Sequence, residues 1–343
     1  MIDSDVTPDV NIKPIWLASE RHRRSRELSQ FFGAELFELL DSDNQIPNRI
    51  IRYAFIFFKA SLILLTKRPK LLFVQNPSIF LTAMICFLSN LFRYSILVDR
   101  HSNFKLSYTG TKKLKWYLFK LVSDYTLKKA RITIVTNLFL AEIVEKKGGV
   151  PFVLEDKLPT LSEANSIELE GKYSIVVIST FSNDEPIEAL IGAALELPED
   201  WMIFFTGCAE KYIDPDRKKK LERRNIRFLG FVPENTYQSL IKSADLVAVL
   251  TTEEYLLNCG AYEAVSLEKA LIVSDTETMK RYFRKGVVYT APYSENILKS
   301  IIYGIENRER LQKEAAELKV ELSEEWRENA QVLIGLINSM MQR

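Results

Sequence analysis

The chain has 343 residues and a formal net charge of +1, with 47% hydrophobic and 27% charged residues. These proportions match ordinary globular proteins and exclude a disordered chain, a collagen-like repeat and a small disulfide scaffold. Three cysteines and two histidines are too few for a disulfide framework or a metal centre built from these residues, so we expect neither a metal nor a cofactor. The length predicts two domains.

The first half alternates short apolar runs with longer segments of helical period, which indicates α/β layers with mostly parallel strands. Its N-terminus is polar and acidic, unlike a signal peptide. The pattern predicts, in chain order, strand Ile15–Ala18, helix Arg24–Phe32, strand Leu71–Gln75, helix Ile79–Phe92, strand Ser95–Asp99, helix Thr111–Lys129 and strand Arg131–Thr136. Tyr53–Leu65 is also apolar but, like Ile79–Phe92, is shorter than the roughly 20 residues of a membrane-spanning helix, so we expect buried or interfacial helices.

The second half repeats this alternation. It predicts strand Tyr173–Ser179, helix Pro186–Leu195, strands Met202–Thr206 and Ile226–Leu229, helix Asn235–Ser243, strand Leu246–Leu250, helix Gly260–Ser266 and strand Ala270–Ser274. Residues 161–172 are polar and without periodicity, which is typical of a linker. We therefore expect an α/β protein with two doubly wound domains, residues 1–160 and 173–320, that face each other across a cleft.

Charge is distributed unevenly between the halves. Residues 1–165 contain 24 basic and 16 acidic residues, whereas the remainder contains 22 basic and 29 acidic residues. From Asn44 to Arg131, 16 basic residues accompany only two acidic ones. This excess, interleaved with Phe- and Leu-rich helices, favours an anionic membrane surface as a partner. No aromatic and basic recognition motif indicates nucleic acid.

Ligands of open α/β sheets bind where the strands end and the following helices begin. After the strand at Leu246–Leu250, the small residues Asn258, Cys259 and Gly260 open a helix that carries Glu263 about one turn further on. The helix start can hold a diphosphate, and the carboxylate can accept hydrogen bonds from a ribose. The alternative is an ordinary helix cap with a surface glutamate.

The segment from Phe228 to Asp275 contains FLGFVPENTYQSLIKSADLVAVLTTEE and GAYEAVSLEKALIVSD. It resembles the donor-binding half of GT-B nucleotide-sugar glycosyltransferases, particularly the retaining family-four (group 1) type, with several submotifs in the same order. The resemblance implies two Rossmann-like domains, of which the first binds the acceptor and the second the nucleotide sugar. It further implies that the final helix, residues 321–343 with Trp326, packs back on the first domain.

Two departures from the family pattern concern the donor site. Glu263 matches the second glutamate of a paired motif, but Tyr255 stands eight residues before it. Either the loop holds one extra residue and Glu254 serves as a catalytic residue, or that contact is absent. The usual Arg and Lys after the first donor strand are replaced by a turn in which Thr180 and Ser182 can bind phosphate. This turn is similar to one in lipid-linked chitobiose mannosyltransferases.

The resemblance also implies roles for residues after other strands. His101 resembles a catalytic histidine that faces the donor sugar, and its alternative is a loop histidine bonded to the backbone. His22, Arg23, Arg24 and Arg26 follow the first strand and can clamp an anionic acceptor, unless they form a solvated basic face. The last candidates are Gly207 and Phe231, which would border the nucleotide base or form ordinary strand ends.

The sequence therefore predicts a metal-independent hexosyltransferase that moves a sugar from a nucleotide-diphosphate sugar to an acceptor hydroxyl. We expect a glycan or lipid-linked acceptor, as in cell-surface polysaccharide assembly, and a cytoplasmic protein peripheral on the inner face of the cell membrane. The alternative is a GT-B scaffold or partner subunit that has lost catalysis. A nucleotide-sugar epimerase would need acid and base groups for which two histidines offer little.

Overall fold

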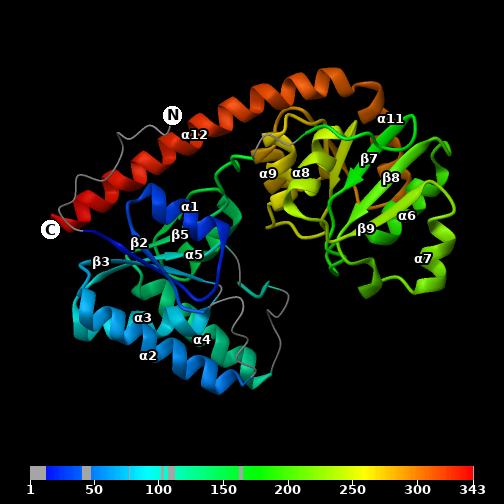
Figure 1. Ribbon diagram of the computed structural model, residues 1–343. Coiled ribbons are helices and arrows are strands. Elements are labelled where there is room, and N and C mark those ends of the chain that lie inside the picture. The colour runs from blue at the N-terminus through cyan, green and yellow to red at the C-terminus, as the bar shows by residue number, and fades with distance from the viewer. Residues whose placement is uncertain are drawn as a thin grey trace. The chain divides into compact units, whose positions relative to one another are not determined.

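The computed structural model describes residues 13–40, 48–76, 78–101, 104–106, 113–161 and 165–342, without the side chain of Arg49 (Figure 1). Expectations for the polar N-terminus, for residues 111–112 of a predicted helix and for residues 162–164 of the predicted linker lie outside these ranges. The described chain forms two compact units. Unit 1 contains the residues up to Lys157 and those from Trp326 onward, and unit 2 contains Leu158–Glu325.

Unit 1 is built on a six-stranded parallel sheet in the order β2-β1-β3-β4-β5-β6. Its strands are β1 (Ile15–Ala18), β2 (Glu35–Glu38), β3 (Leu71–Gln75), β4 (Ser95–Asp99), β5 (Ile132–Val135) and β6 (Pro151–Val153). Its helices are α1 (Arg23–Phe31), α2 (Arg49–Lys67), α3 (Ile79–Phe92), α4 (Leu114–Lys129) and α5 (Leu138–Lys146).

Alternating side chains of these strands supply two cores, one on each face of the sheet. Ile15 and Leu17 pack with residues of α2 and α3. Trp16 points to the other face, where it stacks on Phe73 at 4.9 Å between ring centroids and packs with residues of α1. Helices therefore cover both faces, which a parallel sheet requires because its strands are apolar on both sides.

Unit 2 is a second six-stranded parallel sheet, in the order β12-β11-β10-β7-β8-β9. Its strands are β7 (Tyr173–Val177), β8 (Trp201–Thr206), β9 (Ile226–Gly230), β10 (Leu246–Val249), β11 (Leu271–Ser274) and β12 (Val287–Thr290). Its helices are α6 (Ile187–Glu196), the 3-10 helix η2 (Ala209–Lys211), α7 (Pro215–Leu221), α8 (Glu234–Ser243), α9 (Cys259–Ser266), α10 (Glu277–Tyr282) and α11 (Ser294–Glu306). The strand order reverses between β7 and β10, the position where doubly wound sheets bind ligands.

The final helix, α12 (Arg308–Met341), contributes to both units. It begins before residue 321, the expected start of the last helix. In unit 1 its Trp326 donates from Nε1 to the carbonyl of Glu155 at 3.1 Å and packs edge-on against Phe31. Among the described residues, no helix is long and apolar enough to cross a membrane.

The predicted α/β class and doubly wound sheets are confirmed, and β1, β3, β4 and α3 have the predicted bounds. The expected linker falls in unit 2 over its described residues. There Leu169 packs on the core, and Ile167 donates its N–H to Ser243 Oγ at 2.8 Å. One apolar side chain and one backbone hydrogen bond therefore attach this segment to unit 2.

Candidate functional site

The loop after β7 encloses a carboxylate of its own chain. The backbone N–H groups of Thr180 and Phe181 donate to Glu185 at 3.0 and 2.8 Å, and that of Ser182 donates at 3.3 Å. Ser179 Oγ and Thr180 Oγ1 add bonds of 2.6 and 3.0 Å. Phe181 has φ +58°, a left-handed conformation that lets successive N–H groups converge on one anion. The donors that the sequence assigns to phosphate at Thr180 and Ser182 therefore already hold Glu185.

The neighbouring Asp184 ties this loop to the loop after β10. Its carboxylate accepts from Thr251 Oγ1 at 3.0 Å, and its carbonyl accepts from the N–H of Thr252 at 2.7 Å. Ser182 also donates to Asp184 through Oγ. Since β7 and β10 flank the reversal of strand order, the two loops that border the ligand position of this sheet are held together.

The start of α9 lies against the end of β7. Asn258 is the residue that precedes the helix, and its side chain makes no capping bond. Its Oδ1 is buried and has no hydrogen-bond partner within the described part of the chain. A Cβ at Gly260 would lie 2.7 Å from Ile178 Cγ2, so the glycine allows this close approach. Cys259, between them, is exposed. Helix starts present N–H groups without intrahelical partners, which favour anions.

Glu263 lies one turn further along α9 and accepts a hydrogen bond of 2.6 Å from the hydroxyl of Tyr237, on α8. Burial raises the pKa of Tyr237, and the charge of Glu263 raises it further. The tyrosine therefore remains a donor and fixes the carboxylate. Glu263 is half-buried, so it is positioned rather than solvated as a surface glutamate would be.

Glu254 caps another helix. Its Oε1 accepts the backbone N–H of Thr278 at 3.0 Å, in the first turn of α10. A carboxylate at this position stabilises the positive end of a helix dipole. Glu254 can therefore serve as a catalytic residue only while one of its oxygens accepts this hydrogen bond.

Gly207 and Phe231 lie near the end of β8 and after β9. Gly207 has φ +84°, and a Cβ there would lie 2.2 Å from the carbonyl oxygen of Ser179, so this glycine is required by the backbone. Phe231 is 75% exposed, with Lys211 Nζ 5.9 Å from its ring centroid. Phe231, unlike Gly207, has an exposed aromatic ring on which a planar base can stack.

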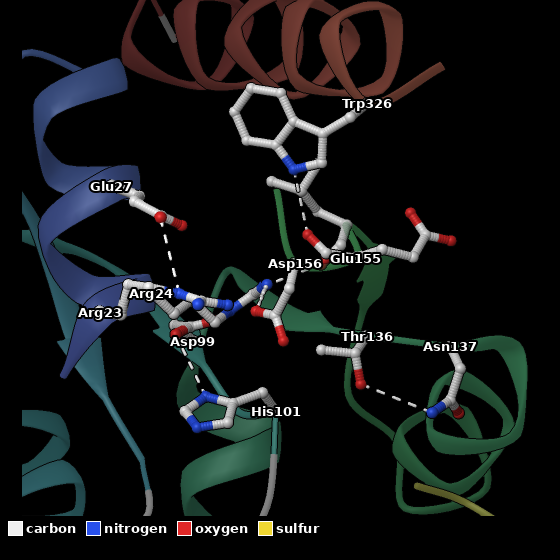
Figure 2. Close-up of polar contacts among 11 residues, drawn as sticks. Arg23, Arg24, Glu27, Asp99, His101, Thr136, Asn137, Glu155, Asp156 and Trp326 are labelled. Carbon is white, nitrogen blue, oxygen red and sulfur yellow. Dashed lines mark hydrogen bonds and ion pairs between the residues drawn. The ribbon is translucent and has the colours of Figure 1, made fainter. Parts of the chain in front are cut away.

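A buried ion-pair network occupies the carboxyl ends of the strands of unit 1 (Figure 2). Arg24 donates to Asp99 at 2.9 Å, to Asp156 at 2.8 Å and to the carbonyl of Leu154 at 2.8 Å. Burial alone would raise the pKa of Asp99, but Arg24 and His101 lower it to about 2. The expected contact of Arg24 with an acceptor is thus replaced by contacts inside unit 1, because two carboxylates from distant segments surround the guanidinium.

The two histidines are neighbours. Their ring centroids are 4.7 Å apart, and Nδ1 of His101 lies 3.4 Å from Oδ2 of Asp99. Burial lowers the pKa of His22, and the nearby His101 lowers it further. Nδ1 of His22 is buried without a hydrogen-bond partner among the described residues. The contact with Asp99 orients the imidazole of His101 and directs Nε2 away from the carboxylate.

The other two arginines of this region are more accessible. Arg26 makes a two-point contact with Glu38, at 2.8 and 2.9 Å, and Arg23 lies 3.6 Å from Glu27. Exposed pairs of this kind are weak and exchange readily with other anions. Of the four predicted acceptor residues, His22, Arg23 and Arg26 therefore remain candidates by position.

Sequence reasoning missed Asp99, Asp156, Asp184, Glu185 and Tyr237 as members of these clusters. Their position in the sequence was the available signal, since Asp99 is the last residue of β4 and the other three acidic residues lie in the loops after β6 and β7. In the parts of the chain that the structure describes, no group of three or more His, Cys, Asp or Glu side chains could hold a metal ion.

Comparison with known proteins identifies the class. Sucrose-phosphate synthase from Thermosynechococcus elongatus is similar over 96% of this chain and 99% of its own, with 14% identity and a TM-score of 0.76. HepE from Anabaena, solved in complex with UDP, is similar over 96% and 100%, with 14% identity and a TM-score of 0.69. A putative UDP-N-acetylglucosamine 2-epimerase from Listeria monocytogenes is similar over 88% of this chain and 82% of its own, with 11% identity and a TM-score of 0.52.

The two parallel sheets and these neighbours define the class as the GT-B fold. Residues 161–331 match the family of glycosyl transferases, group 1, and over this segment the chain belongs to that family. This match confirms the resemblance to group 1 glycosyltransferases that the sequence predicted. No curated protein sequence matches it significantly.

Proposed function

We propose that this glycosyltransferase moves a hexose from a nucleoside-diphosphate sugar to a hydroxyl of a lipid-linked or cell-surface glycan precursor, without a metal ion. The observation that carries the proposal is Glu263, held by Tyr237 one turn inside the helix that starts beside the strand reversal. HepE, a structural neighbour, has been solved with UDP and with UDP-glucose, which supports a donor of this class.

In this proposal Glu263 accepts hydrogen bonds from the ribose, and Phe231 borders the base. The first turn of α9, at Asn258–Gly260, holds the diphosphate and stabilises the charge that develops as the sugar departs. The unpartnered Oδ1 of Asn258 can accept a hydrogen bond from a sugar hydroxyl. Thr180 acts indirectly, because it holds Glu185 and fixes the loop after β7.

We further propose that His101, oriented by Asp99, contacts the transferred sugar and that His22, Arg23 and Arg26 contact the acceptor. Arg23 and Arg26 have carboxylate partners that a phosphate can replace. Because the acceptor would be anionic and lipid-linked, we place the protein in the cytoplasm, peripheral on the inner face of the cell membrane.

The test is a titration of the chain with UDP-glucose and other nucleotide sugars, followed by thermal unfolding and donor turnover. A ligand at 100 times its Kd adds about 2.7 kcal/mol to stability. E263Q should weaken donor binding about tenfold, since it removes one charge-assisted hydrogen bond of about 1.4 kcal/mol. The matched control is E234Q on α8, where Glu234 accepts from Gln238. Equal donor affinity in E263Q and the wild type would remove Glu263 from the site.

A second candidate is a GT-B scaffold or partner subunit without catalysis. It is favoured by one observation, that Glu185 occupies the loop donors where the sequence leads us to expect phosphate contacts. The same titration separates the two candidates. Stabilisation together with slow donor hydrolysis supports the enzyme, whereas the absence of stabilisation by every nucleotide sugar supports the scaffold.

A further inference from the structure

Helix α2 is apolar on the side that faces away from its core. One stripe of the helix is buried in the core of unit 1 and consists of Ile56, Ala60, Ile63 and Leu64. A second stripe, at spacings of four and three residues, is between 44% and 69% exposed and consists of Ile51, Phe55, Phe58, Leu62 and Leu65. The outer side of a surface helix is ordinarily polar, so this stripe calls for a covering partner.

The exposed apolar surface continues on α3 and α4, which lie beside α2 in one layer on the sheet of unit 1 (Figure 1). Tyr53 of α2 and Phe80 of α3 have ring centroids 4.6 Å apart, which joins the first two helices. The remaining exposed members are Ile50 and Phe57 on α2, Phe87 and Leu91 on α3, and Leu114, Tyr117, Leu118, Leu121 and Tyr125 on α4. Of the 28 exposed large hydrophobic residues found among the described residues, 16 belong to these three helices.

The same three helices carry almost only positive charge. α2 and α4 each contain four Lys or Arg residues, α3 contains no charged residue, and the single acidic residue of the three helices is Asp124. The carboxylate of Asp124 lies 3.3 Å from Lys147 Nζ, and Arg52 and Lys67 of α2 pair with Glu20 and Glu35, so these charges are balanced within the unit. The other six basic residues of the three helices remain. Arg68 and Arg93 add two positive charges directly after α2 and α3. An apolar surface with basic side chains matches the interface of an anionic bilayer, where acyl chains lie beneath negative headgroups.

We propose that α2, α3 and α4 form a membrane-docking surface that binds unit 1 to an anionic lipid bilayer. The exposed Phe and Leu side chains enter the interface, and the Lys and Arg side chains contact lipid phosphates. A second copy of the chain fits this surface less well, because a symmetric dimer would set basic residues against basic residues. The proposal deepens the proposed function by naming the surface that reaches a lipid-linked acceptor.

The test is flotation of the full chain with phosphatidylcholine vesicles, prepared with and without phosphatidylglycerol. We expect binding to the vesicles that contain phosphatidylglycerol and release by salt. F87E/L91E should lower the partition coefficient by at least about tenfold, because each side chain loses its apolar burial. K115E/K120E should lower it by about fivefold per residue on anionic vesicles only.

The control is V332E/L336E, which places the same charges at exposed positions of α12, also in unit 1. This variant should float like the wild type. Thermal unfolding and UDP-glucose titration without vesicles verify that each variant is folded. E263Q should float normally, so a failed donor assay and a failed docking assay remain distinguishable.

Three results would overturn the docking surface. The first is the absence of flotation with anionic vesicles, and the second is equal flotation of F87E/L91E and the wild type. The third is a dimer in sedimentation analysis that F87E/L91E dissociates while vesicle binding is absent, since this would make the surface an interface between copies.

Discussion

Arg24 and Asp99 form an ion pair almost completely removed from solvent, with side chains 3% and 0% exposed and a distance of 2.9 Å from Nε to Oδ1. The residues are 75 positions apart, at the start of α1 and the end of β4. The remaining nitrogens of Arg24 bind Asp156 and the carbonyl of Leu154, after β6. This network therefore holds together three segments at the strand ends where His101 lies.

Replacing Arg24 with Met should destabilise unit 1 by about 3–5 kcal/mol, because it leaves Asp99 buried without its cationic partner. Urea unfolding measures this loss. The matched control is R26M, on the same helix, whose contact with Glu38 is exposed and whose loss should leave the unfolding midpoint unchanged. Equal midpoints for R24M and the wild type would contradict the assigned role of the pair.

The pH dependence of stability should show the same network. The pKa of Asp99 falls from 3.8 to about 2 on folding, so its contribution of about 2 kcal/mol is complete above pH 4 and is lost as the pH falls toward 2. Burial lowers the pKa of His22, so a separate loss should begin as the pH falls below 6.5. Urea unfolding at several pH values measures both. D99N should lack the loss of stability between pH 4 and 2, and H22N should lack the loss that begins below pH 6.5.

Glu185 should be structurally essential to its loop. E185A leaves the N–H groups of Thr180, Phe181 and Ser182 without their carboxylate, which should cost about 1.5–3 kcal/mol and speed hydrogen exchange at these amides. Differential scanning calorimetry and amide exchange measure the effect. The control is E196A, an exposed glutamate of α6, the helix that follows this loop. Unaltered exchange in E185A would show that the loop does not depend on this carboxylate.

Substitutions at Gly207 and Gly230 distinguish the cost of a left-handed backbone conformation from the cost of a steric clash. Both have positive φ and they pair in an isolated bridge, but only at Gly207 does a Cβ meet backbone, at 2.2 Å from Ser179. G230A should cost about 1–2 kcal/mol for the left-handed conformation alone. G207A should cost at least about 2 kcal/mol more because the backbone must shift. Thermal unfolding compares the two, and equal losses would refute the close approach.

The fully buried strands could be predicted because burial on both faces produces an unbroken apolar run. β1 and β3 are such strands, β4 is buried except at Ser95, and the bounds of all three were predicted correctly. β2, β6 and β12 were missed, since they are only partly buried strands at the edges of their sheets. A short, half-buried strand has no unbroken apolar run in its sequence, so the strand is defined only by its pairing with a neighbouring strand.

The sequence by itself determined the α/β class, the two sheets and the strand ends at which the candidate site residues lie, because these follow from local periodicity. Only the tertiary structure decided which of those residues remain available. Thr180 holds Glu185, and Arg24 is enclosed by Asp99 and Asp156, which lie 75 and 132 positions away. The fold brings together charges that are distant in the chain, and burial makes their pairing obligatory, so no local pattern could reveal it.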